Sequence, residues 1–236
     1  MEALERIVFL DTETTGLDPR LGHRIIEVAA VEVIGRQVTG AAIHFFVDPE
    51  RDIDAGATAV HGFTWDDLRG KPQFGAIVDS VVKFLADSRV VIHNAAFDVS
   101  FLDSEMARLR LPPMASRECS VEDSLALARK KYPGKRNSLD ALCDRLGVDN
   151  SQRNLHGALL DARLLADVYL AMTRGQGSFE IQLPGTEQAY AATVDAHSYS
   201  SETTSFYSVL LSEESKEAHQ KLTSILGAQS GILHNW

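Results

Sequence analysis

The chain has 236 residues, of which 44% are hydrophobic and 24% are charged, so it holds enough apolar material for one sizeable core. Its acidic start lacks the basic segment of a secretory signal, and no run reaches the roughly 18 apolar residues of a membrane span, so we expect a soluble, cytoplasmic protein. The net charge of −10 argues against a broad surface that grips long nucleic acids by their phosphates, and Cys119 and Cys143 are expected to be reduced core thiols.

The first half of the chain alternates between strand and helix patterns. β-branched and aromatic runs at 6–11, 25–34 and 41–47 predict three successive antiparallel strands. Residues 74–86 place apolar side chains on one helical face, residues 90–92 are a short apolar strand, and residues 97–109 predict another helix. This order is typical of an α/β domain.

Two further helices are predicted before the pattern weakens. Ser138 can cap a helix that stops at Gly147, and residues 159–172 follow a longer helical pattern without internal glycine or proline. We therefore interpret residues 1–175 as one α/β domain.

The rest of the chain divides into two parts. Residues 176–205 are mostly small, polar and aperiodic, which is typical of a flexible linker. Within a C-terminal segment of residues 206–236, a strand is predicted at 206–211 and a helix at 212–226. A segment of about thirty residues cannot bury a stable core alone, so we expect it to fold against a partner.

The first candidate site lies at the end of the first predicted strand. Asp11 and Glu13 are two residues apart, so both carboxylates point to the same side of the strand and together invite a cation. Taken alone, the pair is also compatible with a solvated strand end. The hydroxyls of Thr14 and Thr15 and the permissive backbone of Gly16 favour close approach to a ligand.

Two more polar clusters follow. Asp98 lies in the first turn of a helix, where a carboxylate can act on a ligand or simply complement the helix dipole. Phe97 beside it is either a core residue or a surface on which a base stacks. His156 precedes the last helix and Asp161 lies about one turn inside it, although a lone histidine there can also serve as a capping or packing residue. The joint occurrence of three clusters favours a functional site.

These clusters resemble the pattern of the DEDDh exonucleases, with Asp-x-Glu in the first motif, Asn-x-x-x-Asp in the second and His-x-x-x-x-Asp in the third. The resemblance implies a ribonuclease H-like α/β fold with a mixed five-stranded sheet flanked by helices. It also implies a 3′-to-5′ exonuclease with His156 as general base and two divalent cations, Mg²⁺ or Mn²⁺, held by Asp11, Glu13, Asp98 and Asp161. Such hard ions prefer oxygen ligands.

The same resemblance implies a pocket for the terminal nucleotide, formed by Thr14, Thr15, Gly16, Leu17, His61, Asn94 and Phe97. Relatives carry an acidic substrate contact in the loop before this histidine, where the chain has Gly56. Lys135 and Arg136 either contact phosphates of the substrate or lie in a solvated loop.

Within that family the chain resembles the proofreading subunits of bacterial DNA polymerase III, in which VFLDTETTGLDP, AVHG, VIHNAAFD, YPGKRNSLDAL and LHGALLDA recur with little change and in the same order. The segment LSEESKEAHQKL and the terminal Trp236 resemble the polymerase-binding end of those subunits. The resemblance implies a frayed or single-stranded 3′ end of DNA as substrate and the polymerase (alpha) subunit as partner of residues 206–236. Gln176, Phe179 and Ile181 form a candidate peptide for the sliding clamp, with ordinary linker as the alternative.

Two other functions remain open from the sequence. An exoribonuclease related to oligoribonuclease would share the three motifs, although such enzymes generally end near the last catalytic helix, whereas this chain continues to residue 236. A catalytically silent binding subunit is the other alternative. The intact carboxylates and histidine argue against it, because a silent site would usually have lost at least one of them.

Overall fold

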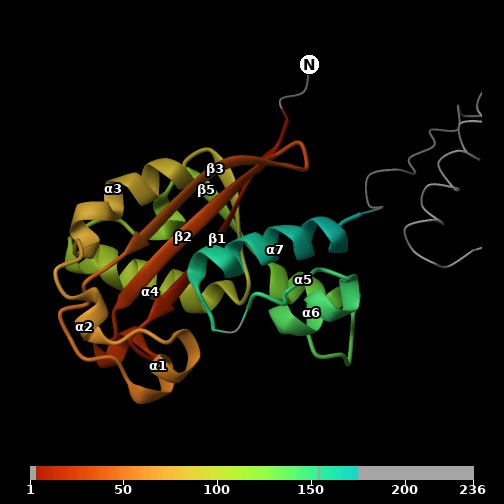
Figure 1. Ribbon diagram of the computed structural model, residues 1–236. Coiled ribbons are helices and arrows are strands. Elements are labelled where there is room, and N and C mark those ends of the chain that lie inside the picture. Colours follow the sequence, from red (N-terminus) through yellow and green to blue (C-terminus); the bar gives the residue numbers. More distant parts are fainter. Residues whose placement is uncertain (1–3, 154, 175–236) are drawn as a thin grey trace, which may run out of the picture. The chain divides into compact units, whose positions relative to one another are not determined.

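A computed structural model describes residues 4–153 and 155–174 of the chain (Figure 1). At its centre is a five-stranded sheet in the order β3-β2-β1-β4-β5. The strands are β1 Arg6–Thr14, β2 Ile25–Ile34, β3 Gln37–Phe46, β4 Ser88–Ile92 and β5 Cys119–Asp123. β2 pairs antiparallel with both β1 and β3, whereas β4 runs parallel to both β1 and β5. The predicted mixed sheet of five strands is confirmed.

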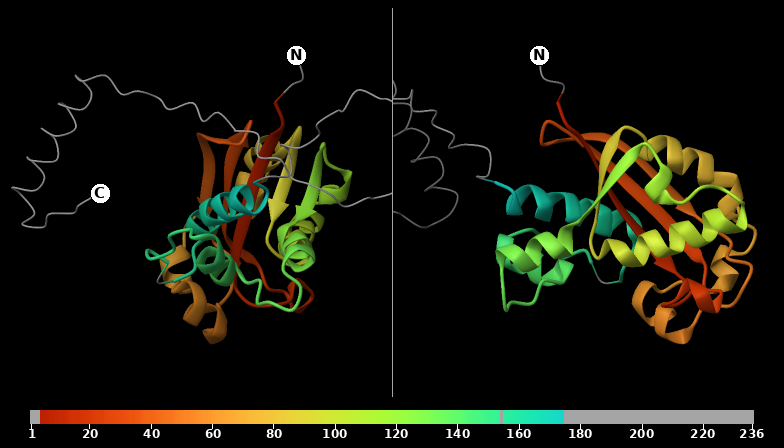
Figure 2. Two further views of the ribbon diagram at one scale, coloured as in Figure 1. Left: turned by 90° about the vertical axis from the view of Figure 1, so that its right-hand side faces the viewer. Right: turned by 180° about the vertical axis from the view of Figure 1, so that it is seen from behind.

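The helices flank this sheet. They are α1 Ala55–His61, α2 Trp65–Leu68, α3 Phe74–Leu85, α4 Ala95–Arg108, α5 Ser124–Lys131, α6 Leu139–Leu146 and α7 Ala158–Met172, with short 3-10 turns at Pro19–Leu21 and Met114–Ser116. Helix α7 packs on β1 and β2, whereas α3 and α4 cover the opposite face (Figures 1 and 2). Helices α5 and α6 contribute buried residues to the same hydrophobic core as α7, and α6 packs against α7.

Side-chain alternation along β1 produces two hydrophobic cores, one on each face of the sheet. Val8 and Leu10 belong to the core that contains the buried residues of α3 and α4. Ile7 and Phe9 belong to the core that contains those of α5, α6 and α7. Because successive residues of a strand point to opposite faces, this register also fixes the direction of the polar residues that follow.

The helix ends follow local sequence signals. The Asp123 carboxylate accepts hydrogen bonds from the first backbone N–H groups of α5, and the Ser138 hydroxyl accepts one from Ala141 at the start of α6. Helix α6 ends at Gly147, whose φ of 68° lies in the left-handed region that suits glycine. These features confirm the predicted start and stop of that helix.

Some predicted boundaries differ from the structure. The first strand continues past residue 11 to Thr14, because its backbone stays paired with β2 after the apolar residues end. The third strand begins at Gln37 rather than at residue 41, since exposed residues there still pair with β2. The α4 and β4 boundaries differ from the predicted ones by one or two residues, which is ordinary for helix and strand ends.

Several expectations fall outside the described residues. The predicted linker, the strand at 206–211 and the helix at 212–226 all do so.

Cys119 and Cys143 are both free, with Cys143 buried and Cys119 half-buried. Among the helices of residues 4–153 and 155–174, none is both long and apolar enough to cross a membrane.

Candidate active site

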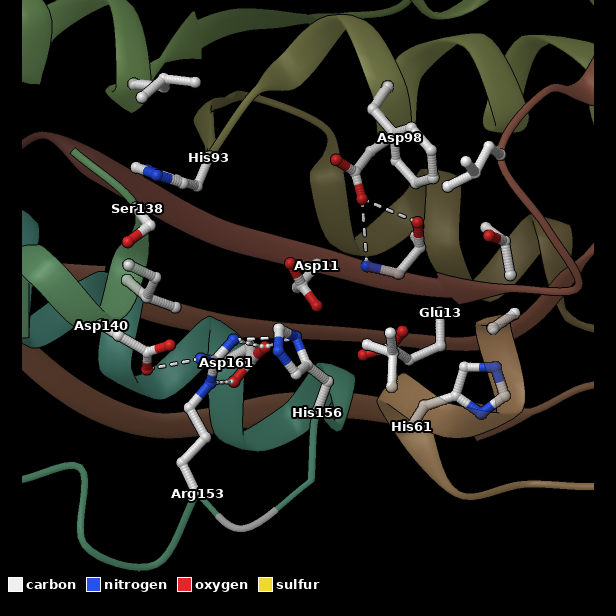
Figure 3. Close-up of a pocket in the computed structure, with 18 of the residues that line it drawn as sticks. Asp11, Glu13, His61, His93, Asp98, Ser138, Asp140, Arg153, His156 and Asp161 are labelled. Atoms are coloured by element: carbon white, nitrogen blue, oxygen red, sulfur yellow. Dashed lines mark hydrogen bonds and ion pairs between the residues drawn. The ribbon is translucent and has the colours of Figure 1, made fainter. Parts of the chain in front are cut away.

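A cleft of about 870 Å³ opens where β1 and β4 end (Figure 3). Its walls come from β1, the segment around α1, the start of α4, the loop before α6, and the start of α7. All five residues predicted to be catalytic line this cleft, namely Asp11, Glu13, Asp98, His156 and Asp161. Folding thus gathers three clusters that are far apart in the sequence.

The alternation of β1 distributes the polar groups between two helices. Asp11 and Glu13 share the side of Ile7 and Phe9, which is the side on which α7 packs. Thr12 points the other way, toward α4, and both its backbone N–H and its hydroxyl donate to Asp98 Oδ1, at 3.1 and 2.7 Å. One strand therefore presents two acids directly and anchors a third on the opposite helix.

The start of α7 is fixed by contacts with two other parts of the fold. The backbone N–H of His156 donates to the carbonyl of Val60 at 3.1 Å. The backbone N–H of Ala158 donates to Glu27 Oε2 at 3.1 Å. With the helix start held in this way, ligand atoms of Glu13, His156 and Asp161 all lie within 4.8 Å of one another.

Arg153 is a further member of the site that the sequence did not reveal. Its Nε and Nη2 donate to Asp161 Oδ1 and Oδ2 at 2.6 and 2.7 Å, and Nη1 donates to Asp140 Oδ1 at 2.5 Å. Nη2 also lies 2.9 Å from His156 Nδ1 (Figure 3). Among the described residues, Asp161 is the one of the four predicted metal-binding acids that forms an ion pair with an arginine.

The four acids differ in the direction of their pKa shifts. Burial, together with the charges of neighbouring carboxylates, raises the pKa of Asp11 and raises that of Glu13 to about 8. Burial also raises the pKa of Asp98 to about 7, although hydrogen bonds from Thr12 oppose the shift. Burial acts in the same direction on Asp161, but the hydrogen bonds and the positive charge of Arg153 prevail and lower its pKa.

This donor set fits a divalent cation. Three carboxyl groups with raised pKa values repel one another when ionised, and a bound cation relieves that repulsion. The donors are carboxylate oxygens with one imidazole nearby, which suits hard ions rather than thiophilic metals. Glu13 and Asp161, together with His156, form the group whose ligand atoms lie close enough together to hold one such ion.

Most residues predicted to bind the nucleotide also line the cleft. Thr14, Gly16, Leu17, His61 and Phe97 do so, as do Gly56 and Lys135. The leucine is 85% exposed at the rim, whereas the His61 ring is buried and its Nε2 has no hydrogen-bond partner among the described residues. The exposed leucine offers an apolar contact to a ligand, whereas His61 Nε2 is itself buried.

Thr15, Asn94 and Arg136 do not line this cleft. Thr15 is fully buried, and its hydroxyl lies 3.0 Å from His23 Nδ1. A Cβ on Gly16 would lie 2.3 Å from the same ring, so glycine is required there for the ring to pack. Asn94 starts α4 with a φ of 72° and donates its backbone N–H to Asp123.

His93, to which the sequence assigned no role, is a further polar residue that lines the cleft. His93 bridges two segments, because its Nε2 donates to the Asn137 carbonyl and its Nδ1 lies within hydrogen-bond distance of the Ser124 hydroxyl, each at 2.9 Å. It thereby ties the start of α5 to the loop before α6. The available signal was a histidine directly after an apolar strand, which needs a hydrogen-bond partner if it is buried.

Comparison with known proteins now decides the family. Residues 8–169 match the family described as Exonuclease (RNase T). The chain is 44% identical over 234 residues to the DNA polymerase III subunit epsilon of Salmonella typhimurium. The matched region covers 97% of this chain and 96% of that relative. The chain belongs to the epsilon-subunit family of exonucleases. Its family thus agrees with the resemblance found in the sequence.

Solved structures support the fold of this family. A structure of exonuclease X in complex with 5′ overhanging duplex DNA matches with a TM-score of 0.57 and 28% sequence identity. The match covers 74% of this chain and 93% of the exonuclease X chain. The zinc-bound Escherichia coli ExoI–ssDNA complex has a TM-score of 0.64 and 22% identity, and covers 73% and 41% of the two chains. The predicted ribonuclease H-like exonuclease fold is confirmed.

These matches establish the class of enzyme. The chain is a metal-dependent exonuclease of the epsilon family, which confirms the prediction of a proofreading exonuclease subunit. The alternatives of an oligoribonuclease-like enzyme and a silent binding subunit gain no comparable support. Gln176, Phe179 and Ile181 lie outside the described residues.

Proposed function

We propose that the chain removes mismatched 3′-terminal nucleotides from DNA by hydrolysis that requires two divalent ions. The observation that carries this proposal is the convergence of four acids and one histidine, from β1, α4 and the start of α7, in one cleft. The names of the relatives support DNA polymerase III as the setting. A mismatched end frays more readily than a paired one, so a site for unpaired strands selects errors without reading the sequence.

The four carboxylates that would hold the ions come from different walls of the cleft. Asp11 and Glu13 approach from β1, Asp98 from α4 and Asp161 from α7. When bound, two Mg²⁺ or Mn²⁺ ions supply positive charge to the phosphate and make a hydroxide nucleophile available at neutral pH. Rigid support for the acids, such as the two hydrogen bonds from Thr12 to Asp98, keeps their oxygens in place.

His156 is the proposed general base. Its side chain is 44% exposed, so the ring borders solvent and a water molecule can reach it. The ring is held near Glu13 and Asp161 by the backbone contact of His156 with Val60. A histidine in this position can accept a proton from an attacking water near neutral pH.

The terminal nucleotide would occupy the part of the cleft next to β1 and α1. Leu17 and Phe97 offer apolar surfaces for the base and sugar, and the buried His61 also lines the cleft. Gly56 leaves this wall open, since a Cβ there would meet no atom within 4 Å. Lys135 also lines the cleft, and its charge suits a phosphate of the substrate strand.

We further propose that residues 206–236 bind the polymerase (alpha) subunit and that Gln176, Phe179 and Ile181 engage the sliding clamp. The net charge of −10 supports a need for partners, because such a protein holds DNA weakly by itself. The match to the Salmonella relative extends over 97% of the chain, so it includes most of this region.

The experiment that tests the nuclease function uses a primer with a mismatched 3′ end, with Mg²⁺, with Mn²⁺, and with EDTA. We expect trimming by the wild-type chain with either ion, and loss of trimming with EDTA or in the variant Asp11→Ala plus Glu13→Ala. The matched control, Asp79→Ala plus Asp144→Ala, removes two exposed acids outside the cleft and should trim normally. Failure of the wild type to trim DNA with either ion would refute the proposal, and trimming of RNA alone would favour the exoribonuclease alternative.

A further inference from the structure

Arg153 occupies an unusual position for a basic residue, inside a site built for cations. Its side chain is only 6% exposed, and the Asp161 side chain that it contacts is 4% exposed. The guanidinium uses Nε and Nη2 to engage both oxygens of that carboxylate, at 2.6 and 2.7 Å. This bidentate geometry is the strongest form of an arginine–carboxylate pair.

The pair competes with any other cation at Asp161. A metal ion bound there would share carboxylate oxygens that already accept two hydrogen bonds, and it would lie close to a second positive charge in a poorly solvated position. The remaining three acids, Asp11, Glu13 and Asp98, have no such arginine contact among the described residues. Arg153 therefore neutralises one ligand of the set and leaves the others open.

The guanidinium of Arg153 also forms an ion pair with a second carboxylate, that of Asp140. Arg153 Nη1 donates to Asp140 Oδ1 at 2.5 Å, and the Asp140 side chain is 54% exposed. The same oxygen accepts a hydrogen bond from Asn150 Nδ2 at 3.3 Å, which helps to hold it in place. The arginine thus bridges a buried acid inside the cleft and a more exposed acid at its edge.

Arg153 also engages the proposed general base. Its Nη2 lies 2.9 Å from His156 Nδ1, and the same ring nitrogen lies 3.3 Å from Asp161 Oδ2. While Nδ1 accepts a hydrogen bond from the guanidinium, its lone pair is not available to take a proton from water. One side chain therefore restrains both the acid and the base carried by the start of α7.

We propose that Arg153 is an internal counter-cation that holds Asp161 and His156 in a resting state, and that it gives up Asp161 while staying on Asp140 when a divalent ion binds. The inference rests on the proposed function, since it takes Asp161 as a metal ligand. It assigns Asp140 the role of retaining the arginine. In these roles Arg153 and Asp140 are positioning residues.

The test measures Mn²⁺ binding by calorimetry and thermal unfolding, both on the full-length chain. In EDTA, Arg153→Met should lower the unfolding temperature by roughly 5 °C or more, because Asp161 is left buried without its partner. The same variant should bind Mn²⁺ at least about tenfold more tightly, since the competing cation is gone. Asp140→Asn should bind Mn²⁺ more weakly than wild type, because the arginine then has only Asp161. Arg69→Met, which removes an arginine from an exposed pair with Asp66, is the matched control and should leave the affinity unchanged.

The outcomes separate this inference from the proposed function. Weaker or unchanged Mn²⁺ binding by Arg153→Met would overturn the counter-cation role and make the arginine a support for Asp161. Unchanged or tighter binding by Asp140→Asn would overturn the role of that acid. If Arg153→Met folds only when Mn²⁺ is present, the inference is supported, and if it does not fold at all, Asp140→Asn decides. A wild-type chain that trims DNA and binds Mn²⁺ keeps the proposed function whatever the variants do, whereas one that does neither refutes both.

Discussion

Glu27 on β2 accepts a hydrogen bond from the backbone N–H of Ala158, the first residue of α7, at 3.1 Å. The side chain is 3% exposed, and its other oxygen lies 2.6 Å from His44 Nε2 on β3. Glu27 is also the residue of β2 that pairs with Glu13 of β1. A single buried carboxylate thus connects the sheet to the helix that carries the third motif.

The contact between Glu27 and α7 leads to the first prediction. Glu27→Ala leaves the first N–H of α7 buried without its acceptor, so we expect a loss of about 1–3 kcal/mol in the free energy of unfolding. The exonuclease rate should fall as well, because His156 and Asp161 lose their fixed position. Glu27→Gln keeps an oxygen acceptor and should lose less of both. Urea unfolding and single-turnover trimming measure the two effects, and an equal loss for both substitutions would show that the negative charge, rather than the hydrogen bond, matters.

The raised pKa values of the cleft acids predict how stability depends on pH without metal. The pKa of Glu13 rises from 4.5 to about 8 and that of Asp98 from 3.8 to about 7 on folding. Between the unfolded and folded values the native state binds more protons than the unfolded state, so stability decreases as pH increases through this range. We therefore expect the free energy of unfolding in EDTA to fall between about pH 5 and pH 8, by an amount on the order of 1 kcal/mol or more.

Variants and metal test that origin. Glu13→Gln should reduce the decrease and should stabilise the metal-free chain at the upper end of the range, because it removes one buried carboxylate. Asp79→Asn, at an exposed acid of α3, should follow the wild type. Saturating Mg²⁺ or Mn²⁺ should also reduce or reverse the decrease, since metal binding favours the deprotonated acids. A free energy of unfolding that rises with pH in EDTA would contradict the raised pKa values.

The sequence predicted the parts of the site that follow a local rule. Asp11 and Glu13 were placed on one side of β1 from strand alternation, and the apolar pattern located the helices that bear Asp98 and Asp161. The strand β5 was not located, because Cys119–Asp123 has a single large apolar residue and is defined by its pairing with β4. Local patterns register burial well but do not register which backbones pair.

Long-range polar contacts were beyond the reach of the sequence. Arg153 lies in a loop without periodicity, and its partners Asp140 and Asp161 come from separate helices. Glu27 was detectable in principle, since an acid inside the apolar run IIEVAAVEVI needs a partner once it is buried. Nothing in that run, however, points to the N–H of Ala158, which lies 131 residues away.

His156 can be tested as a base rather than a metal ligand. A ring nitrogen of His156 lies within 4.8 Å of carboxylate oxygens of Glu13 and Asp161, so the geometry alone allows the histidine to act as a base or as a metal ligand. If it acts as the base, His156→Asn should lower the trimming rate by about 10²- to 10⁴-fold while Mn²⁺ affinity changes little. Calorimetry and single-turnover kinetics on the same preparation measure both. A large loss of Mn²⁺ affinity in this variant would assign the histidine to the metal site instead, and Glu13→Gln is the control that should lose affinity.

The last prediction separates the role of the nuclease domain from that of the residues after 175. In the part of the chain that the structure describes, both hydrophobic cores are built by residues between Ile7 and Met172, and a chain of residues 1–175 retains all of these. We expect this truncated chain to trim a mismatched primer at close to the wild-type rate but not to bind the polymerase subunit in size-exclusion chromatography. The full-length variant Asp11→Ala plus Glu13→Ala should show the reverse, with binding intact and trimming lost. If the truncated chain still binds the polymerase, the docking surface must lie on the nuclease domain, and the role proposed for residues 206–236 would be wrong.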